Sequence, residues 1–326
     1  MNKKLKKTIF ILLPILLGVF LIWIYIGKFT DEELDKIIYN LKNANYWWIL
    51  LSLFFGILSH LSRAYRWHFM LEPLGYKPKF ANSVMAVLLA YLLNLVIPRS
   101  GEVARAATLV KYENVPFEKG FGTIVAERIS DVIMLLIILG VVFFYQADLI
   151  LSYFTGVNPT NKIITLVIFL IVSFIGIKLI KKSNHPFLVK VKSFISGLIE
   201  GVSSILLMKK KWAFIFHTAF IWLMYIAMFW AVTYTVPETS NLSFETILVG
   251  FIAGAVAMSI TNGGFGAYPV FVASAFALYG IDKEAGASFG LLMWISQTIM
   301  VLAFGGLSLL TLPIINNTNL VKENTL

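Results

Sequence analysis

Two short segments combine arginines with carboxylates inside a mostly apolar chain. Residues 97–105 read Ile-Pro-Arg-Ser-Gly-Glu-Val-Ala-Arg, and residues 126–131 read Ala-Glu-Arg-Ile-Ser-Asp. Guanidinium groups bind phosphate through charge-assisted hydrogen bonds, and positioned carboxylates act as acids, bases or counterions. A headgroup-binding or chemical role is therefore expected first for Arg99, Glu102, Arg105, Glu127, Arg128 and Asp131.

The first segment has the pattern of a break between two half-helices. Pro98 ends one helix, Ser100 is expected to cap the next, and Glu102 falls in its first turn, where a carboxylate complements the helix dipole. Backbone N–H groups from Ser100 and Gly101 onward, with Arg99 and Arg105 nearby, predict a site for a lipid phosphate. The alternative is that Glu102 pairs with one of these arginines and only stabilises the helix. Both interpretations remain open.

The second segment precedes an apolar run that is too short to cross a bilayer alone. At 1.5 Å per residue, residues 132–145 cover about 21 Å of the roughly 30 Å of hydrocarbon, so the charged residues before them must also enter. Arg128 and Asp131 are i,i+3 neighbours, whereas Glu127 and Asp131 repel at i,i+4 unless a cation such as Arg63 or Arg105 lies between them. The alternative is a solvated cluster at the inner interface.

A third segment, residues 262–266, reads Asn-Gly-Gly-Phe-Gly. Gly263, Gly264 and Gly266 permit positive φ and close backbone approach, and Pro269 suits the first turn of a following helix. The spacing is not that of a nucleotide-binding loop. We include these glycines in the predicted substrate-binding site.

Composition indicates the environment of these segments. Hydrophobic residues make up 59% of the 326 residues, charged residues 13%, and the mean hydropathy is +0.82, which exceeds what one soluble core can bury. The net charge of +10 comes from lysine clusters without a nucleic-acid motif. The chain has no Cys, and its four His show no ligand spacing, so we expect no disulfide, metal or cofactor.

Hydropathy and the distribution of Lys and Arg predict the topology. The interrupted apolar regions 80–120 and 244–280 make no net crossing if both termini and the basic loops are cytoplasmic, so each is expected to form a re-entrant helical hairpin. Hairpins entering from opposite faces suggest an inverted-topology repeat. The predicted fold is an all-α polytopic membrane protein with one domain over residues 1–326, two hairpins and six transmembrane helices, at residues 8–27, 46–62, 124–146, 162–181, 212–236 and 287–312.

Two further patterns concern packing. Apolar residues recur at helical spacing over residues 185–208, which predicts a cytoplasmic amphipathic helix on the membrane surface. Glycines four residues apart, at 250 and 254 and again at 286 and 290, favour close helix contacts.

The two charged segments, taken in order, resemble the Pro-Gly-x-x-Gly-Glu and Glu-Arg-x-x-Asp motifs of the flippase-like membrane domain of lysylphosphatidylglycerol synthases. Residues 263–266 occupy the place of that family's Pro-Gly-Gly-x-Gly motif. The resemblance covers nearly the whole chain and implies an all-helical domain that moves lipids between leaflets. Two departures matter: Tyr268-Pro269 stand where the family often has Arg-Glu, and the chain ends at Leu326 without the aminoacyl-transferring domain, so a synthase is not expected.

We therefore expect a non-enzymatic transporter that moves a phospholipid or another anionic lipid-linked substrate between leaflets. A noncatalytic scaffold and, less favoured, a membrane enzyme acting on lipid-linked substrates are the alternatives. The expected partners are lipids with anionic headgroups, with a second copy of the chain as a further option and nucleic acid excluded. The expected location is a bacterial cytoplasmic membrane.

Overall fold

Helices form every regular element that the computed structural model describes, which confirms the all-helical prediction. The structure describes residues 29–145 and 207–316, together with residues 20, 23–27, 189 and 205. The chain divides into two compact units: unit 1 comprises residues 1–125 and 212–326, and unit 2 comprises residues 126–211.

Four helices in the described part are long and apolar enough to cross a membrane: α3 (Tyr46–Leu71), α6 (Phe117–Tyr145), α10 (Lys211–Thr233) and α13 (Lys283–Ile315). They coincide with four of the predicted spans. Helix α3, however, continues well past residue 62, where the prediction ended it, because Arg is a good helix former and most side chains beyond that point are buried. The predicted spans 8–27 and 162–181 and the amphipathic helix 185–208 lie largely or wholly outside the described residues.

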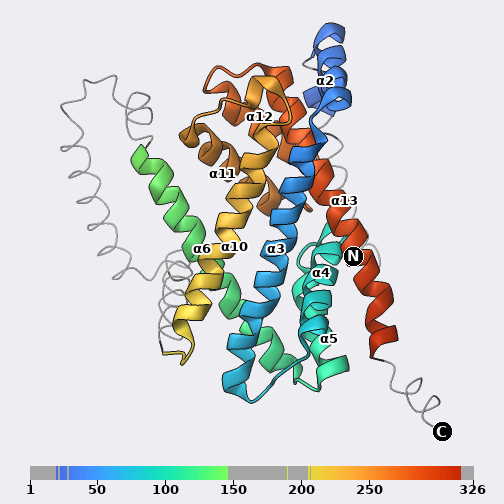
Figure 1. Cartoon of the computed structure of the whole chain (residues 1–326), viewed down its shortest axis with the longest axis vertical. Coiled ribbons are helices and arrows are strands. Elements are labelled where there is room, and N and C mark those ends of the chain that lie inside the picture. Colours follow the sequence, from blue (N-terminus) through green and yellow to red (C-terminus); the bar gives the residue numbers. More distant parts are fainter. Residues whose placement is uncertain are drawn as a thin grey trace. The chain divides into compact units, whose positions relative to one another are not determined.

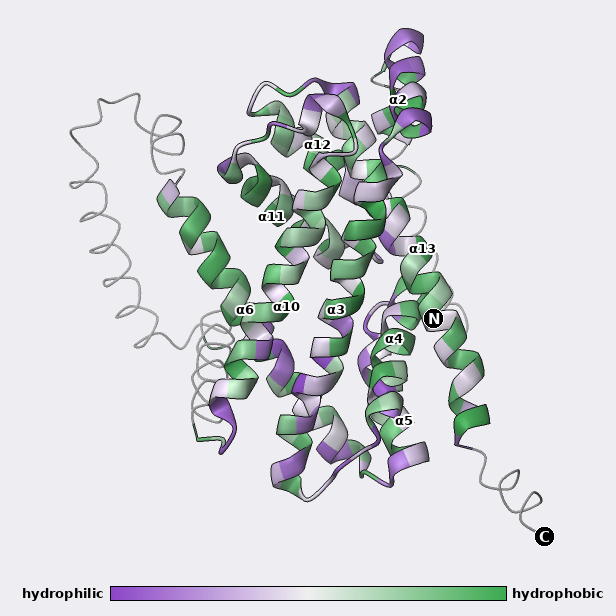
Figure 2. Cartoon of the chain, viewed as in Figure 1, coloured by the Kyte–Doolittle hydropathy of each residue, from purple (hydrophilic) through white to green (hydrophobic). Residues whose placement is uncertain are grey.

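Large apolar side chains on these helices point outward. Trp47 on α3 is 79% exposed and Leu310 on α13 is 65% exposed, and hydropathy colouring shows apolar residues along both helices (Figure 2). Outward apolar surface on this scale is a liability in water and is matched by lipid. The chain is an integral multi-pass membrane protein.

Two pairs of shorter apolar helices form hairpins within unit 1. Helices α4 (Phe80–Val96) and α5 (Ser100–Glu113) pack against each other, as do α11 (Phe244–Ile260) and α12 (Ala267–Ala277). The two pairs lie at opposite ends of unit 1 (Figure 1). Both breaks fall where the sequence predicted them. We call residues 95–105, which run from the end of α4 into α5, tip 1, and residues 261–266 tip 2.

Small residues let the second hairpin pack closely against its neighbours. A Cβ added at Gly290 of α13 would lie 2.6 Å from the Cα of Pro269, and one added at Gly250 of α11 would lie 2.5 Å from the Phe276 ring. The Phe276 ring lies 5.0 Å from that of Phe289, in the apolar core of unit 1. The packing role predicted for the spaced glycines is confirmed.

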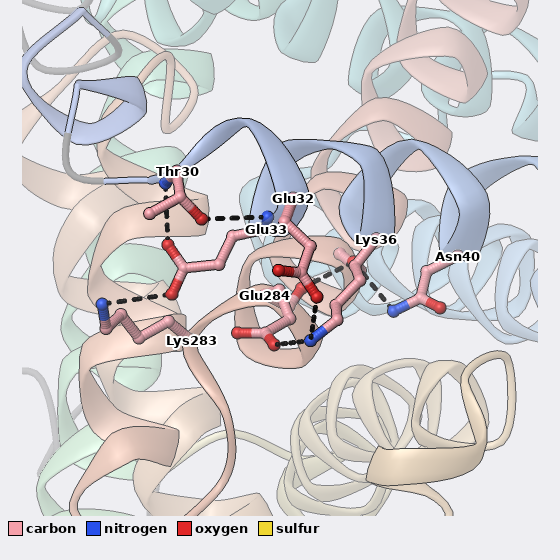
Figure 3. A network of polar contacts seen from close by, with 8 residues as sticks. Thr30, Glu32, Glu33, Lys36, Asn40, Lys283 and Glu284 are labelled. Atoms are coloured by element: carbon pink, nitrogen blue, oxygen red, sulfur yellow. Dashed lines mark hydrogen bonds and ion pairs between the residues drawn. The ribbon is translucent and has the colours of Figure 1, made fainter.

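A polar helix precedes the first described span. Helix α2 (Asp31–Asn43) begins with a capping box, in which the Glu33 amide donates to Thr30 Oγ1 at 3.2 Å and the Thr30 amide donates to Glu33 Oε2 at 2.9 Å. Two residues in the first turn of α13 form ion pairs with α2 (Figure 3). Lys283 Nζ lies 3.4 Å from Glu33 Oε1, and Glu284 Oε1 lies 3.4 Å from Lys36 Nζ. These contacts attach α2 to the start of α13.

The attachment of α2 should depend on the charge of Glu33. The hydrogen bond from the Thr30 amide, aided by the Lys283 ammonium, lowers the pKa of Glu33 below its ordinary 4.5. Stability from this carboxylate is therefore present at neutral pH and is lost as pH falls through the lowered pKa. We expect Glu33→Gln to increase hydrogen exchange in α2 modestly at neutral pH and to match the wild type in acid. Asp35→Asn, which alters an exposed carboxylate of the same helix, is the control; an equal effect of both variants would contradict the role of Glu33.

Candidate functional site

Tip 1 is closed by side chains of the helix that precedes it. The amide of Gly101 donates to Asn94 Oδ1 at 2.7 Å, and the Ser100 hydroxyl donates toward the carbonyls of Leu93 and Ile97 at 3.0 and 2.8 Å. Ser100 is thus the first residue of α5 and not its N-cap, which corrects the prediction. Because Asn94 already accepts a hydrogen bond from one first-turn amide, fewer backbone donors are left for a phosphate than the sequence suggested.

Arg99 is the residue at the N-cap position, and its backbone is strained. Its φ of 60° and ψ of 12° lie in the left-handed region, which costs a residue with a Cβ of order 1 kcal/mol or more. The side chain of Arg99 is exposed. Strain of this kind often marks a functional position.

Gly101 makes the close approach of α5 to α4 feasible. A Cβ at this position would collide with the carbonyl oxygen of Ala90 and would lie 2.8 Å from Asn94 Nδ2. The residue is buried in helix α5, so the requirement for glycine comes from space and not from φ. Glu102 follows in the first turn, as predicted, and is half-buried.

Arg105 is held by an aromatic partner that the sequence did not indicate. Its guanidinium lies 3.8 Å from the centroid of the Trp67 ring, and Arg105 is 3% exposed. The Trp67 indole is itself fixed, because its Nε1 donates to Thr123 Oγ1 at 2.8 Å. A desolvated cation–π contact of this kind contributes about 2 kcal/mol. It fixes a buried positive charge one helical turn beyond Glu102.

Two more arginines are buried in α3, beyond residue 62, where the predicted span ended. Arg66 Nη1 donates to Thr218 Oγ1 at 2.9 Å, and Arg63 Nη2 donates to the Tyr225 hydroxyl at 3.2 Å, both across to α10. The spacing of polar residues in the sequence does indicate that these arginines are buried. Four polar residues recur seven, four and three positions apart and so lie along one face of α3, and all four are buried: Ser52, Ser59, Arg63 and Arg66.

Tip 2 is uncharged. Gly263, Gly264 and Gly266 all have positive φ, between 59° and 78°, so the expected conformational role of these glycines is confirmed. The Trp294 indole of α13 donates to the Gly263 carbonyl at 2.8 Å and fixes the turn. Pro269 lies in the first turn of α12, as predicted.

The two tips meet. The position that a Cβ would take on Gly263 is occupied by Leu95 Cδ2, from the last turn of α4. The side chain of Leu95 and the bare backbone of tip 2 therefore touch, and a larger residue at Gly263 would separate them. Two helix interruptions distant in sequence form one contact at the interior ends of the hairpins.

The three charged residues of the second segment lie in unit 2. Arg128 Nη1 pairs with Asp131 Oδ2 at 3.7 Å, which confirms the predicted i,i+3 pair. Glu127 is 1% exposed and Asp131 9%. The predicted cluster linking Glu102 to Glu127, Arg128 and Asp131 joins residues of different units and stays a prediction.

Charged and neutral components of the predicted site are thus separated in unit 1. Tip 1 provides Arg99, Glu102 and Arg105, whereas tip 2 provides glycine backbone. Within the described ranges, no group of three or more His, Asp or Glu side chains is arranged to hold a metal ion. The site as described suits binding of a charged group through side chains.

The chain is similar to several known membrane proteins. The family described as the lysylphosphatidylglycerol synthase TM region matches residues 11–305. The UPF0104 membrane protein MJ1595 of Methanocaldococcus jannaschii is 27% identical, covering 95% of this chain and 96% of the relative. The UPF0104 membrane protein PH1989 of Pyrococcus horikoshii is 25% identical over 53% of this chain and 51% of its own length.

A third relative has a named activity. The glycosyltransferase AglD of Haloferax volcanii is 31% identical over 87 residues, which are 26% of this chain and 14% of the relative. No solved structure matches the chain.

Proposed function

Because the chain belongs to the family of the lysylphosphatidylglycerol synthase transmembrane region, we propose that it moves a lipid with a phosphate-bearing headgroup between the leaflets of a membrane. The contact between the two broken hairpins is the observation that carries this proposal. Secondary transporters bind substrates where discontinuous helices meet near the bilayer midplane, because unwound backbone is tolerated there only beside protein or a wet cavity.

In this proposal the side chains of tip 1 replace headgroup hydration. Arg99 is exposed and makes the first contact with phosphate, and Arg105, fixed on Trp67, provides a second positive charge. Glu102 balances these charges when the site is empty. The acyl chains remain in the bilayer throughout, since the outer surfaces of the long helices are apolar. The proposal assigns the chain no chemical step.

The topology belongs to the same proposal. We propose six crossings, cytoplasmic termini, one re-entrant hairpin from each face, and an inverted-topology relation between the halves. The opposite placement of α4–α5 and α11–α12 within unit 1 supports it (Figure 1). The basic residues of the α3–α4 connection support a cytoplasmic position for that end.

Cysteine labelling tests the topology in a chain with no native Cys. Single cysteines at Asp35 and Glu238, both exposed, should react with an impermeant maleimide added to intact cells. Cysteines at Lys77 and Lys119, also exposed, should react only after the membrane is opened. Labelling of Lys77→Cys in intact cells would exclude this orientation.

Lipid movement is tested with purified protein in vesicles that contain acyl-labelled lipids. Phospholipids and polyprenyl-phosphate lipids with and without a sugar form the panel; the sugar-bearing lipids are included because one relative is a glycosyltransferase by name. The protein should raise the dithionite-accessible fraction of at least one lipid above that of protein-free vesicles. If none moves and affinity purification recovers a stable membrane partner, the scaffold alternative replaces the proposal.

A further inference from the structure

A second group of polar and aromatic side chains lies between α3, α4 and α10, apart from both tip sequences. We call His60, Arg63, Tyr91, Trp222 and Tyr225 the central cluster. Arg63 Nη2 donates to the Tyr225 hydroxyl at 3.2 Å, and the hydroxyls of Tyr225 and Tyr91 are 3.0 Å apart. The rings of His60 and Tyr91 are 4.5 Å apart, and those of Trp222 and Tyr225 are 6.1 Å apart.

Two members of the central cluster have buried nitrogen atoms with no hydrogen-bond partner in the described part of the chain. These are Trp222 Nε1 and His60 Nδ1, in residues that are 9% and 6% exposed. The Trp222 N–H is a buried donor without an acceptor, which costs about 1–3 kcal/mol, and His60 Nδ1 donates or accepts according to its tautomer. Tyr91 and Tyr225 are only partly buried. A bound group that supplies oxygen atoms would remove the cost.

The chemistry of the central cluster limits what that group is. The indole N–H is only a donor, the guanidinium carries only donors, and the tyrosine hydroxyls donate as well as accept. The aromatic faces, the indole N–H and the tyrosine hydroxyls suit a hydroxylated group, whereas an ammonium group would meet the N–H donors of Trp222 and Arg63.

We propose that the central cluster binds the hydroxyl-bearing part of the headgroup, so that the substrate is a phosphate lipid with a polyol or sugar headgroup and not an amine. This inference rests on the proposed lipid movement and adds the class of headgroup. Glycerol and a hexose share the same oxygen chemistry. The cluster accepts either of them while tip 1 holds the phosphate.

Three lipids labelled on their acyl chains distinguish the headgroups in the vesicle assay: phosphatidylglycerol, a hexosyl-phosphoryl polyprenol and phosphatidylethanolamine. We expect the wild type to move one or both hydroxylated lipids faster than the amine lipid. Trp222→Phe and Tyr91→Phe should each lower the hydroxylated-lipid rate about fivefold, the factor for one neutral hydrogen bond, with little change for phosphatidylethanolamine. Trp230→Phe is the matched control on α10 and should leave both rates unchanged.

The ratio of the two rates is the decisive measurement, because a purely structural defect would lower both rates together. Equal wild-type rates for hydroxylated and amine lipids, or an unchanged ratio in both variants, would overturn the inference and leave lipid movement intact. A binding measurement tests the central cluster even if the protein moves no lipid in the vesicle assay. Dihexanoyl phosphatidylglycerol should raise the melting temperature of the wild type in detergent more than dihexanoyl phosphatidylethanolamine does. The difference between the two lipids should be smaller in Trp222→Phe.

The binding result separates the two proposals. Selective stabilisation by the glycerol lipid without any lipid movement would reject the proposed transport and retain the binding site. Stabilisation of the wild type by neither short-chain lipid, or by both to the same extent, would show that the central cluster does not select hydroxylated headgroups. In that case water is the group that satisfies Trp222 and His60.

Discussion

Gly101→Ala is expected to destabilise the folded protein severely. The added methyl group would collide with the Ala90 carbonyl and press on Asn94, whose side chain caps the Gly101 amide. Overpacking costs about 1–3 kcal/mol and loss of a buried hydrogen bond about the same again. A total of about 2–6 kcal/mol is a large share of the usual 5–15 kcal/mol of stability. Thermal unfolding in detergent measures the effect.

Two adjacent glycines of α13 provide the controls for this prediction. A Cβ at Gly305 would lie 2.6 Å from Leu92 Cβ and 2.9 Å from the Leu88 carbonyl oxygen, whereas nothing lies within 4 Å of one at Gly306. Gly305→Ala should therefore also lower the melting temperature. Gly306→Ala should raise it or leave it unchanged, because Ala favours helix over Gly by about 1 kcal/mol. A wild-type melting temperature for Gly101→Ala would show that α5 does not approach α4 so closely.

Loss of the charges at tip 1 is expected to reduce lipid movement by at least about tenfold. Arg105→Ala removes a guanidinium that is buried against Trp67, and the cation–π contact that is lost contributes about 2 kcal/mol. Arg105→Lys preserves the charge without the planar stacking and should be intermediate. Glu102→Gln should also slow movement, since it alters the counterion in the first turn of α5. The initial rate in vesicles is the measurement.

Lys111→Ala on the same helix is the control for charge, because it removes an exposed cation. It should keep the wild-type rate. Each variant is first checked for a normal melting temperature, which separates a transport defect from unfolding. Wild-type rates in both Arg105→Lys and Glu102→Gln, in protein that moves lipid, would exclude tip 1 as the headgroup path.

The sequence by itself determined where the helices break and which residues lie at the breaks. Pro98 and the glycines of residues 263–266 oppose a continuous helix through local backbone sterics, so no tertiary contact is needed to locate them. The lengths of the apolar segments similarly predict which helices cross a membrane, because hydropathy is a property of each segment alone. The i,i+3 spacing of Arg128 and Asp131 was enough to predict their pair.

Only the tertiary structure decided which side chains the breaks contact. Asn94 caps α5 instead of Ser100, and Trp67 holds Arg105, because α3, α4 and α5 pack together in one specific way. The contact of Gly263 with Leu95 joins elements far apart in the chain. The hydropathy prediction ended the span before Arg63 and Arg66. A hydropathy scale assigns each arginine a free-energy cost of entering the membrane and takes no account of its hydrogen-bond partners. Hydrogen bonds to α10 offset that cost, and such bonds exist only once the helices are packed.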